Sequence, residues 1–95
     1  MMNIDVYKAP DSYAHSQGQE FILLVIKNAL VFVVSKDEAG IKGICHGPVE
    51  NSWMAKDIMK GEDAINREDL PAVVNDVIDM LPETMEGLPA NPNWN

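Results

Sequence analysis

The sequence contains little of what defines several common classes of small protein. It has one cysteine, Cys45, so no internal disulfide can form, which excludes the disulfide-rich secreted class. Seven basic side chains stand against fifteen acidic ones, and the resulting net charge of −8 disfavours direct binding to nucleic acid. The longest apolar stretch, residues 21–34, is broken by Lys27 and Asn28 and is shorter than the roughly 20 residues that a membrane helix needs.

The remaining composition is that of an ordinary globular domain. The chain has 95 residues, of which 46% are hydrophobic and 23% charged, so we expect a single domain over residues 1–95 with one modest core. Its N-terminal stretch, MMNIDVYKAPDS, lacks a basic segment followed by an apolar one, so no signal peptide is indicated. We therefore expect a cytoplasmic protein that does not bind membranes.

Two apolar runs in the first half predict a β-hairpin. Residues 21–26 and 29–34 are rich in β-branched and aromatic side chains and flank Lys27 and Asn28, which we predict to be the loop. A single buried helix over this region is the alternative, but the β-branched residues argue against it.

Pairing the two runs around this loop puts apolar side chains on both faces of the hairpin. One face would carry Ile22, Leu24, Ile26, Ala29, Val31 and Val33. The other would carry Phe21, Leu23, Val25, Leu30, Phe32 and Val34. The face that helices leave open could be covered by residues 9–19, by the C-terminal tail with Trp94, or by a second subunit, so a homodimer is expected as one solution.

Two more strands complete the first half. Ile4 and Val6 alternate with polar neighbours, as in a half-buried strand, and residues 41–45 form another short strand after a turn. Residues 9–19 are polar and rich in turn formers, so they are expected to be a loop.

The sequence pattern in the second half of the chain predicts two helices. Ser52 is placed to cap a helix over residues 53–60, and Asp69 is placed to cap a second one that Pro82 ends. In this second helix the apolar residues recur at helical spacing, at Leu70, Val73, Val74, Val77, Ile78 and Leu81.

Together these elements predict an α+β fold. A four-stranded antiparallel meander in residues 1–46 precedes two helices within residues 52–81, packed on one face of the sheet in the order ββββαα. Residues 82–95 lack periodicity and are expected to form an extended tail.

The only candidate catalytic pair is Cys45 with His46, in the stretch GICHGP. These residues resemble the nucleophile turn of the ThiJ/PfpI superfamily, in which a strand ends at a Cys-His pair followed by Gly and then a helix. The resemblance covers residues 44–48 and implies a thiol-dependent enzyme with Cys45 as nucleophile. However, that family has a longer βαβα sheet, and neighbouring side chains on a strand point to opposite faces. The simpler interpretation makes Cys45 a small buried hydrophobic residue and His46 a residue at the rim of the core.

No cofactor or metal is expected. His15, Cys45 and His46 lack the C-x-x-C or H-x-x-x-H spacing of metal sites. The glycines around them match neither a dinucleotide-binding fingerprint nor a Walker motif.

The second half carries most of the negative charge, with ten acidic and three basic residues over residues 49–95. On the second predicted helix, Asp69, Asp76 and Asp79 lie away from the apolar stripe, and Asp76 and Asp79 occupy the half where the helix dipole favours cations. No basic partner is within sequence reach. Other acidic residues extend the surface: Glu62, Asp63, Glu68, Glu83 and Glu86.

An acidic surface of this kind has an ordinary explanation, which is solubility, and a functional one, which is docking to a basic protein. On the functional interpretation, we expect a non-enzymatic binding protein, inhibitor or immunity-like, that uses Asp69, Asp76, Asp79, Glu83 and Glu86. A thiol-dependent enzyme at Cys45 is the alternative, and a purely structural dimerisation module is the third.

Overall fold

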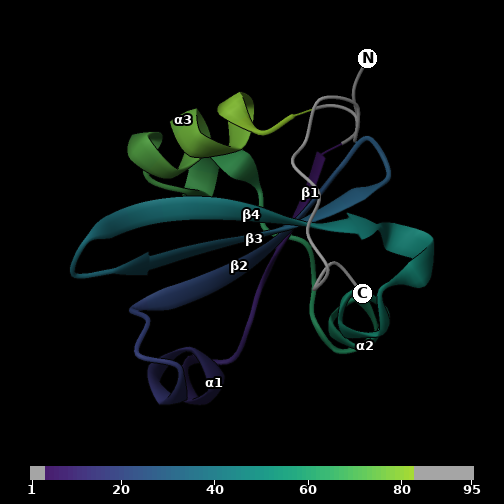
Figure 1. The fold of residues 1–95 in the computed structure, drawn as a ribbon, viewed down its shortest axis with the longest axis horizontal. Helices are drawn as coiled ribbons and strands as arrows, with labels where there is room; N and C mark the ends of the chain where they lie inside the picture. The colour runs from purple at the N-terminus through teal and green to yellow at the C-terminus, as the bar shows by residue number, and fades with distance from the viewer. Residues whose placement is uncertain (1–3, 83–95) are drawn as a thin grey trace.

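The computed structural model describes residues 4–82, and these confirm the predicted α+β class and meander. The elements in chain order are β1 (Ile4–Lys8), α1 (Asp11–Ser16), β2 (Phe21–Lys27), β3 (Leu30–Asp37), β4 (Gly40–Pro48), the 3-10 turn η1 (Val49–Asn51), α2 (Trp53–Gly61), the 3-10 turn η2 (Arg67–Asp69) and α3 (Ala72–Met80). Each strand pairs antiparallel with the next, in the order β1-β2-β3-β4 (Figure 1).

One helix was not expected. Residues 9–19 contain α1, so the order of elements is βαβββαα rather than ββββαα. The helix is short, and only Ala14 of its residues is buried, against a small cluster with Ala9 and Ile22. A polar segment with one small buried side chain has no apolar periodicity, which is why the sequence pattern indicated a loop.

The hairpin turn lies one residue later than predicted. Lys27 pairs with Leu30, which makes Asn28 and Ala29 the two central turn residues, with φ of 52° and 64°. Positive φ at both positions is what a type I′ turn requires, and its twist matches that of the flanking strands. Because a two-residue loop preserves the alternation, the apolar side chains divide between the faces as predicted, except that Ala29 lies in the turn.

Ala29→Gly should raise the free energy of unfolding by about 0.5–1 kcal/mol, because a Cβ is disfavoured in the left-handed region that Gly adopts freely. Chemical denaturation measures the change. Ala39→Gly is the matched control, since Ala39 lies in the two-residue β3–β4 turn without a positive φ and should gain nothing. Equal effects of the two substitutions would contradict the assigned turn.

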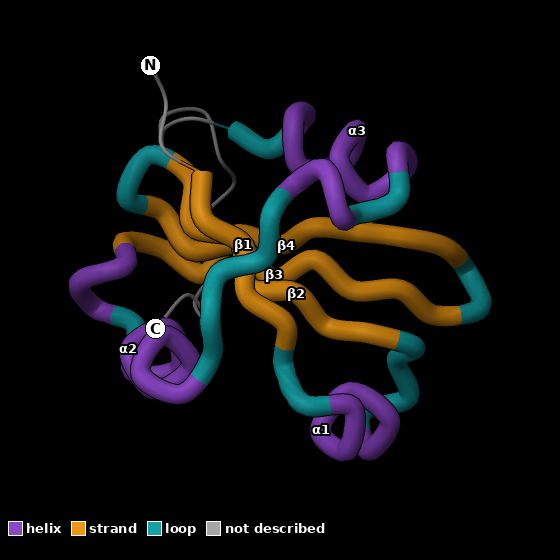
Figure 2. The backbone as a smooth tube through the Cα atoms, turned by 180° about the vertical axis from the view of Figure 1, so that it is seen from behind, coloured by secondary structure: helices purple, strands orange, loops and turns teal. Residues whose placement is uncertain are grey.

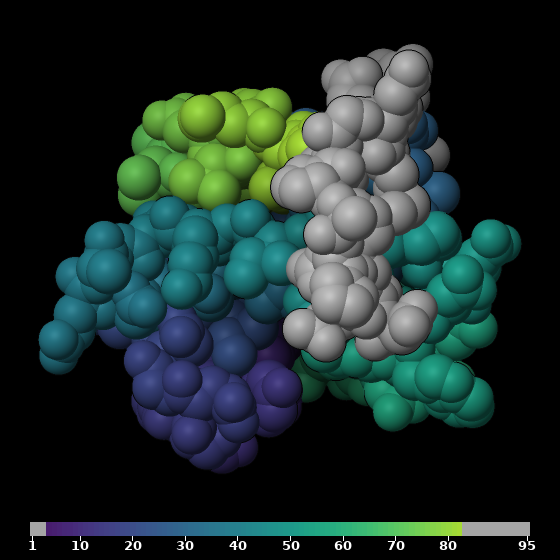
Figure 3. Space-filling view, in the orientation of Figure 1, coloured from purple at the N-terminus to yellow at the C-terminus, as the bar shows by residue number. Residues whose placement is uncertain are grey.

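Helices cover both faces of the sheet, so the prediction that both helices pack on one face is wrong. On one face, the C-terminal helix and the residue after it bury Val74, Ile78 and Leu81 against Val6, Leu23, Val25, Leu30, Phe32, Val34 and Cys45. On the other, Ala55 of α2 packs on Leu24, Ile26 and Val31. Figures 1 and 3 show α3 on one side of the strands and α1 and α2 on the other. Strand alternation makes both faces apolar, and each needs its own cover.

This arrangement removes the reason for expecting a second subunit on the sheet, because helices of the same chain already cover both faces. The homodimer therefore stays a prediction without that support. The tail with Trp94 lies outside the described residues.

The connection between α2 and α3 carries the chain from one face of the sheet to the other (Figure 2). It runs along the outer edge of β1, where the backbone N–H of Ile65 donates a hydrogen bond of 2.7 Å to the carbonyl oxygen of Val6. This bond gives the edge strand a partner and holds the segment that carries Glu62, Asp63, Glu68 and Asp69.

Of the two predicted helix caps, one is present and the other is not. Ser52 caps α2 as predicted, because its hydroxyl oxygen accepts a hydrogen bond of 3.1 Å from the backbone N–H of Ala55. Asp69 does not cap α3; it lies in η2, and α3 begins after Pro71. The proline explains this, since it disfavours helical geometry at Leu70, which is extended at φ −95° and ψ 148°.

Lys27 holds the C-terminal end of α3. Its side chain is only 3% exposed, and its Nζ donates hydrogen bonds to the carbonyl oxygens of Ile78 at 3.1 Å, Asp79 at 3.3 Å and Leu81 at 2.7 Å. The Ile78 carbonyl also accepts the backbone N–H of Leu81 at 3.2 Å, whereas those of Asp79 and Leu81 lie too near the end of α3 to find a donor within it, and the helix dipole favours a cation there. The positive charge that the sequence pattern lacked at the end of α3 therefore comes from β2.

Candidate functional site

Cys45 belongs to the hydrophobic core. It lies opposite Phe32 in the β3–β4 pairing, on the face that α3 covers, and only 8% of its surface is exposed. The thiol is free and buried. The simpler interpretation of Cys45, as a small buried hydrophobic residue, is confirmed.

His46 occupies a β-bulge. Phe32 pairs with Cys45 and Val31 pairs with Gly47, so His46 is the extra residue on β4. The imidazole is partly buried, and burial lowers its pKa. The Cys45 thiol stays inside the core, where a substrate would have to displace packed side chains to reach it. The geometry therefore gives no support to a thiol-dependent enzyme.

The lowered pKa of His46 predicts a pH dependence of stability. Because its folded-state pKa lies below the ordinary 6.5, the unfolded chain binds the proton more readily than the folded protein. Its contribution to the free energy of unfolding is complete above the unfolded-state pKa and is lost as the pH falls from there through the folded-state pKa. Denaturation midpoints at a series of pH values below neutrality should fall less steeply for His46→Gln than for the wild type. His15→Gln, at an exposed histidine, should behave like the wild type, and identical profiles for all three proteins would contradict the assignment.

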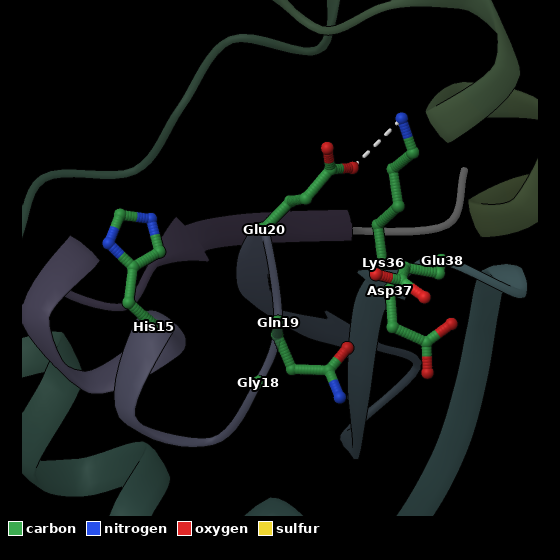
Figure 4. Close-up of a pocket in the computed structure, with 7 residues that line it drawn as sticks. All are labelled: His15, Gly18, Gln19, Glu20, Lys36, Asp37 and Glu38. Carbon is green, nitrogen blue, oxygen red and sulfur yellow. Dashed lines mark ion pairs between the residues drawn. The ribbon is translucent and has the colours of Figure 1, made fainter.

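A hollow of about 740 Å³ lies between the α1–β2 connection and the β3–β4 turn (Figure 4). Glu20 and Lys36 form an ion pair of 3.0 Å here, while His15 stands apart from the other side chains drawn. The side-chain oxygen of Gln19 is buried and has no hydrogen-bond partner among residues 4–82. No three His, Cys, Asp or Glu side chains in the described part of the chain are arranged to hold a metal ion.

The strongest candidate for function is a charged surface on the α2–α3 segment. Residues 62–79 contain six acidic side chains and one arginine, a net charge of −5. All six acidic residues are exposed. We use the term acidic surface for five of them: Glu62, Asp63, Glu68, Asp69 and Asp76.

Asp79 is not part of this surface, because it has a basic partner. Its Oδ1 accepts a hydrogen bond of 2.7 Å from Nη2 of Arg67, a tertiary partner twelve residues away that lies beyond the sequence reach considered above. Arg67 Nε also donates to Oδ1 of Asn75 at 2.9 Å, and the Asn75 amide donates back to the Arg67 carbonyl oxygen at 2.7 Å. We call this set of contacts the Arg67 clamp.

The Arg67 clamp ties η2 to α3 and thereby fixes two of the predicted docking residues. Asp69 follows Arg67 by two positions and Asp76 follows Asn75, so both lie on elements that the clamp joins. No ion pair of Asp69 or Asp76 occurs within residues 4–82. Glu83 and Glu86, the other two predicted docking residues, lie outside the described residues.

None of the helices in residues 4–82 is both long and apolar enough to cross a bilayer. Comparison of the chain with models of protein families, with curated proteins and with solved structures gave no match. The function is therefore inferred from the exposed side chains and their geometry.

Proposed function

We propose that the protein is a non-enzymatic binding module that docks a basic protein partner through its acidic surface. The observation that carries this proposal is the placement of six exposed acidic side chains and a single arginine on residues 62–79. The arginine is already paired with Asp79, so the carboxylates of the acidic surface are left for an external cation.

The physical advantage of such a surface is faster and more selective encounter. Complementary charge raises association rates and disfavours wrong partners, and it acts over about 8 Å at physiological ionic strength. A partner whose basic surface normally faces nucleic acid would be blocked by this contact. An inhibitor or immunity-like role is the function we propose on this basis.

Three sets of contacts hold the backbone of the acidic surface to the rest of the fold. The Arg67 clamp holds η2 on α3, the Ile65 backbone bond holds the connection on β1, and Lys27 holds the far end of the helix. Side chains on a fixed backbone lose less conformational freedom on binding than those on a mobile loop. This supports recognition by the surface beyond its contribution to solubility.

Reversing the two best-placed charges tests the proposal. The double substitution Asp69→Lys and Asp76→Lys should weaken the affinity for the basic partner by about tenfold or more, mainly through slower association. Both side chains are exposed and outside the Arg67 clamp, so the fold should be preserved. Titration calorimetry or surface plasmon resonance with the partner purified from the native host gives the affinity.

A second double variant separates this surface from overall charge. Glu38→Lys with Glu50→Lys changes the net charge by the same amount, at exposed positions on the β3–β4 turn and on η1. We expect this control to keep nearly the wild-type affinity. If both double variants bind equally well, the acidic surface is not the docking surface.

A further inference from the structure

An apolar groove adjoins the acidic surface. It lies between the strands and the start of α3, has a volume of about 270 Å³, and is lined mainly by apolar side chains. The residues that matter here are Phe21, Leu23, Leu70 and Val74. The volume is below the range of about 300–1,000 Å³ that is usual for small-molecule sites, so the groove suits a single large side chain.

The charges at the rim of this groove favour a basic occupant. Its two charged lining residues are Lys8 and Asp69. The Lys8 ammonium is paired with Asp11 at 3.0 Å, whereas Asp69 is exposed and has no ion pair within residues 4–82. The net field at the rim is therefore negative, and Asp69 makes the groove continuous with the acidic surface.

We infer that the groove receives one large apolar side chain, such as leucine, from the basic segment of the partner that docks on the acidic surface. This inference rests on the proposed docking function and specifies the partner chemistry: a lysine- or arginine-rich segment with an apolar anchor among its cations. An apolar anchor in a pocket, ringed by charged contacts that exclude water, is the usual source of affinity at protein interfaces.

A second apolar groove serves as an internal control. It is about 370 Å³, lies between α1 and α2, and is lined by Met54 and Ile58 among others. Its charged lining residue is Asp57, but α2 carries two lysines, Lys56 and Lys60, against this one acid, so the helix lacks the net negative charge that surrounds the groove beside Asp69. A basic partner should therefore use the groove beside Asp69 and not this one.

The test uses two synthetic lysine-rich peptides that differ at one position, leucine in the first and alanine in the second. Each is titrated into the full chain while the methyl resonances of Leu23, Leu70, Val74, Met54 and Ile58 are followed by NMR. We expect the leucine peptide to bind about tenfold more tightly than its alanine twin. Methyl shifts should appear at Leu23, Leu70 and Val74 only, and Asp69→Lys should weaken both peptides.

Each alternative outcome has a separate meaning. Equal affinity of the two peptides, still weakened by Asp69→Lys, would overturn the groove while the docking function stands. Shifts at Met54 and Ile58 in place of the first set would also overturn it. Affinity that Asp69→Lys does not change, or no binding of either peptide, would overturn the inference and count against the docking function too.

Other occupants would be visible in the same spectra without peptide. Groove methyl shifts that grow with protein concentration would show that a second copy fills the groove. Nuclear Overhauser contacts between Trp94 and the groove methyls at low concentration would show that the chain fills it itself. Either result would overturn the inference.

Discussion

Ile78→Ala should lower the free energy of unfolding by about 2–5 kcal/mol. Ile78 is completely buried between α3 and the sheet, in the same cluster as Phe32 and Val25. Removing its outer carbons leaves a cavity on the face of the sheet that only α3 covers among the described helices, and the strands cannot collapse to fill it. Urea denaturation followed by circular dichroism measures the loss.

The matched control lies on the same helix. Met80 is 83% exposed, so Met80→Ala should change the free energy of unfolding by less than about 0.5 kcal/mol. If the two substitutions cost the same, α3 does not pack on the sheet through Ile78, and the assignment of one helix to this face is wrong.

Lys27→Met should lower the free energy of unfolding by about 2–4 kcal/mol, although the new side chain is apolar and of similar length. The substitution removes the donor of three hydrogen bonds and leaves the carbonyl oxygens of Ile78, Asp79 and Leu81 without it at a buried helix end. It also removes the cation that the helix dipole favours there. Chemical denaturation gives the magnitude, and amide hydrogen exchange in the last turn of α3 should accelerate most.

Lys36→Met is the control for this second prediction. Lys36 lies on the neighbouring strand, and its ammonium pairs with Glu20 at 3.0 Å, where both side chains are largely exposed. Surface ion pairs of this kind contribute about 0–1 kcal/mol. A cost for Lys27→Met no larger than that for Lys36→Met would contradict the role of Lys27 as the cap of α3.

Local patterns in the sequence were sufficient to predict the strands of the sheet and the faces on which their side chains lie. Alternation and β-branched residues identify the strands, and a two-residue loop anywhere near Asn28 assigns the same side chains to each face. That is why a turn misplaced by one residue left the division of the core unchanged. The cap at Ser52 is also a local signal, since donor and acceptor are three residues apart.

Contacts between distant residues account for what the sequence pattern missed. Lys27 was expected in a turn and instead caps a helix more than fifty residues later, a pairing that no periodicity records. Arg67 and Asp79 are twelve residues apart and are separated by the break at Pro71, so helical spacing could not match them. The choice of face for α2 and α3 depends on the path of their connection along β1, which is likewise a tertiary feature.

Part of the candidate site could likewise be predicted from the sequence, and part of it depends on tertiary contacts. Exposure of Asp76 follows from its place opposite the apolar stripe of α3 and was predictable, whereas Asp69 is exposed on η2, outside that helix. The pairing of Asp79 and the groove beside Asp69 both require the folded chain, because they join residues from β2, η2 and α3. Cys45 is the opposite case. The sequence motif suggested a catalytic nucleophile, and the strand pairing places the residue in the hydrophobic core.

The central claim is that the acidic surface binds a basic partner by direct charge contact, and the salt dependence of the affinity tests it most directly. Dissociation constants measured from low to physiological salt should rise steeply for the wild type and for Glu38→Lys with Glu50→Lys. For Asp69→Lys with Asp76→Lys the dependence should be markedly flatter. Equal slopes for the three proteins would contradict the claim.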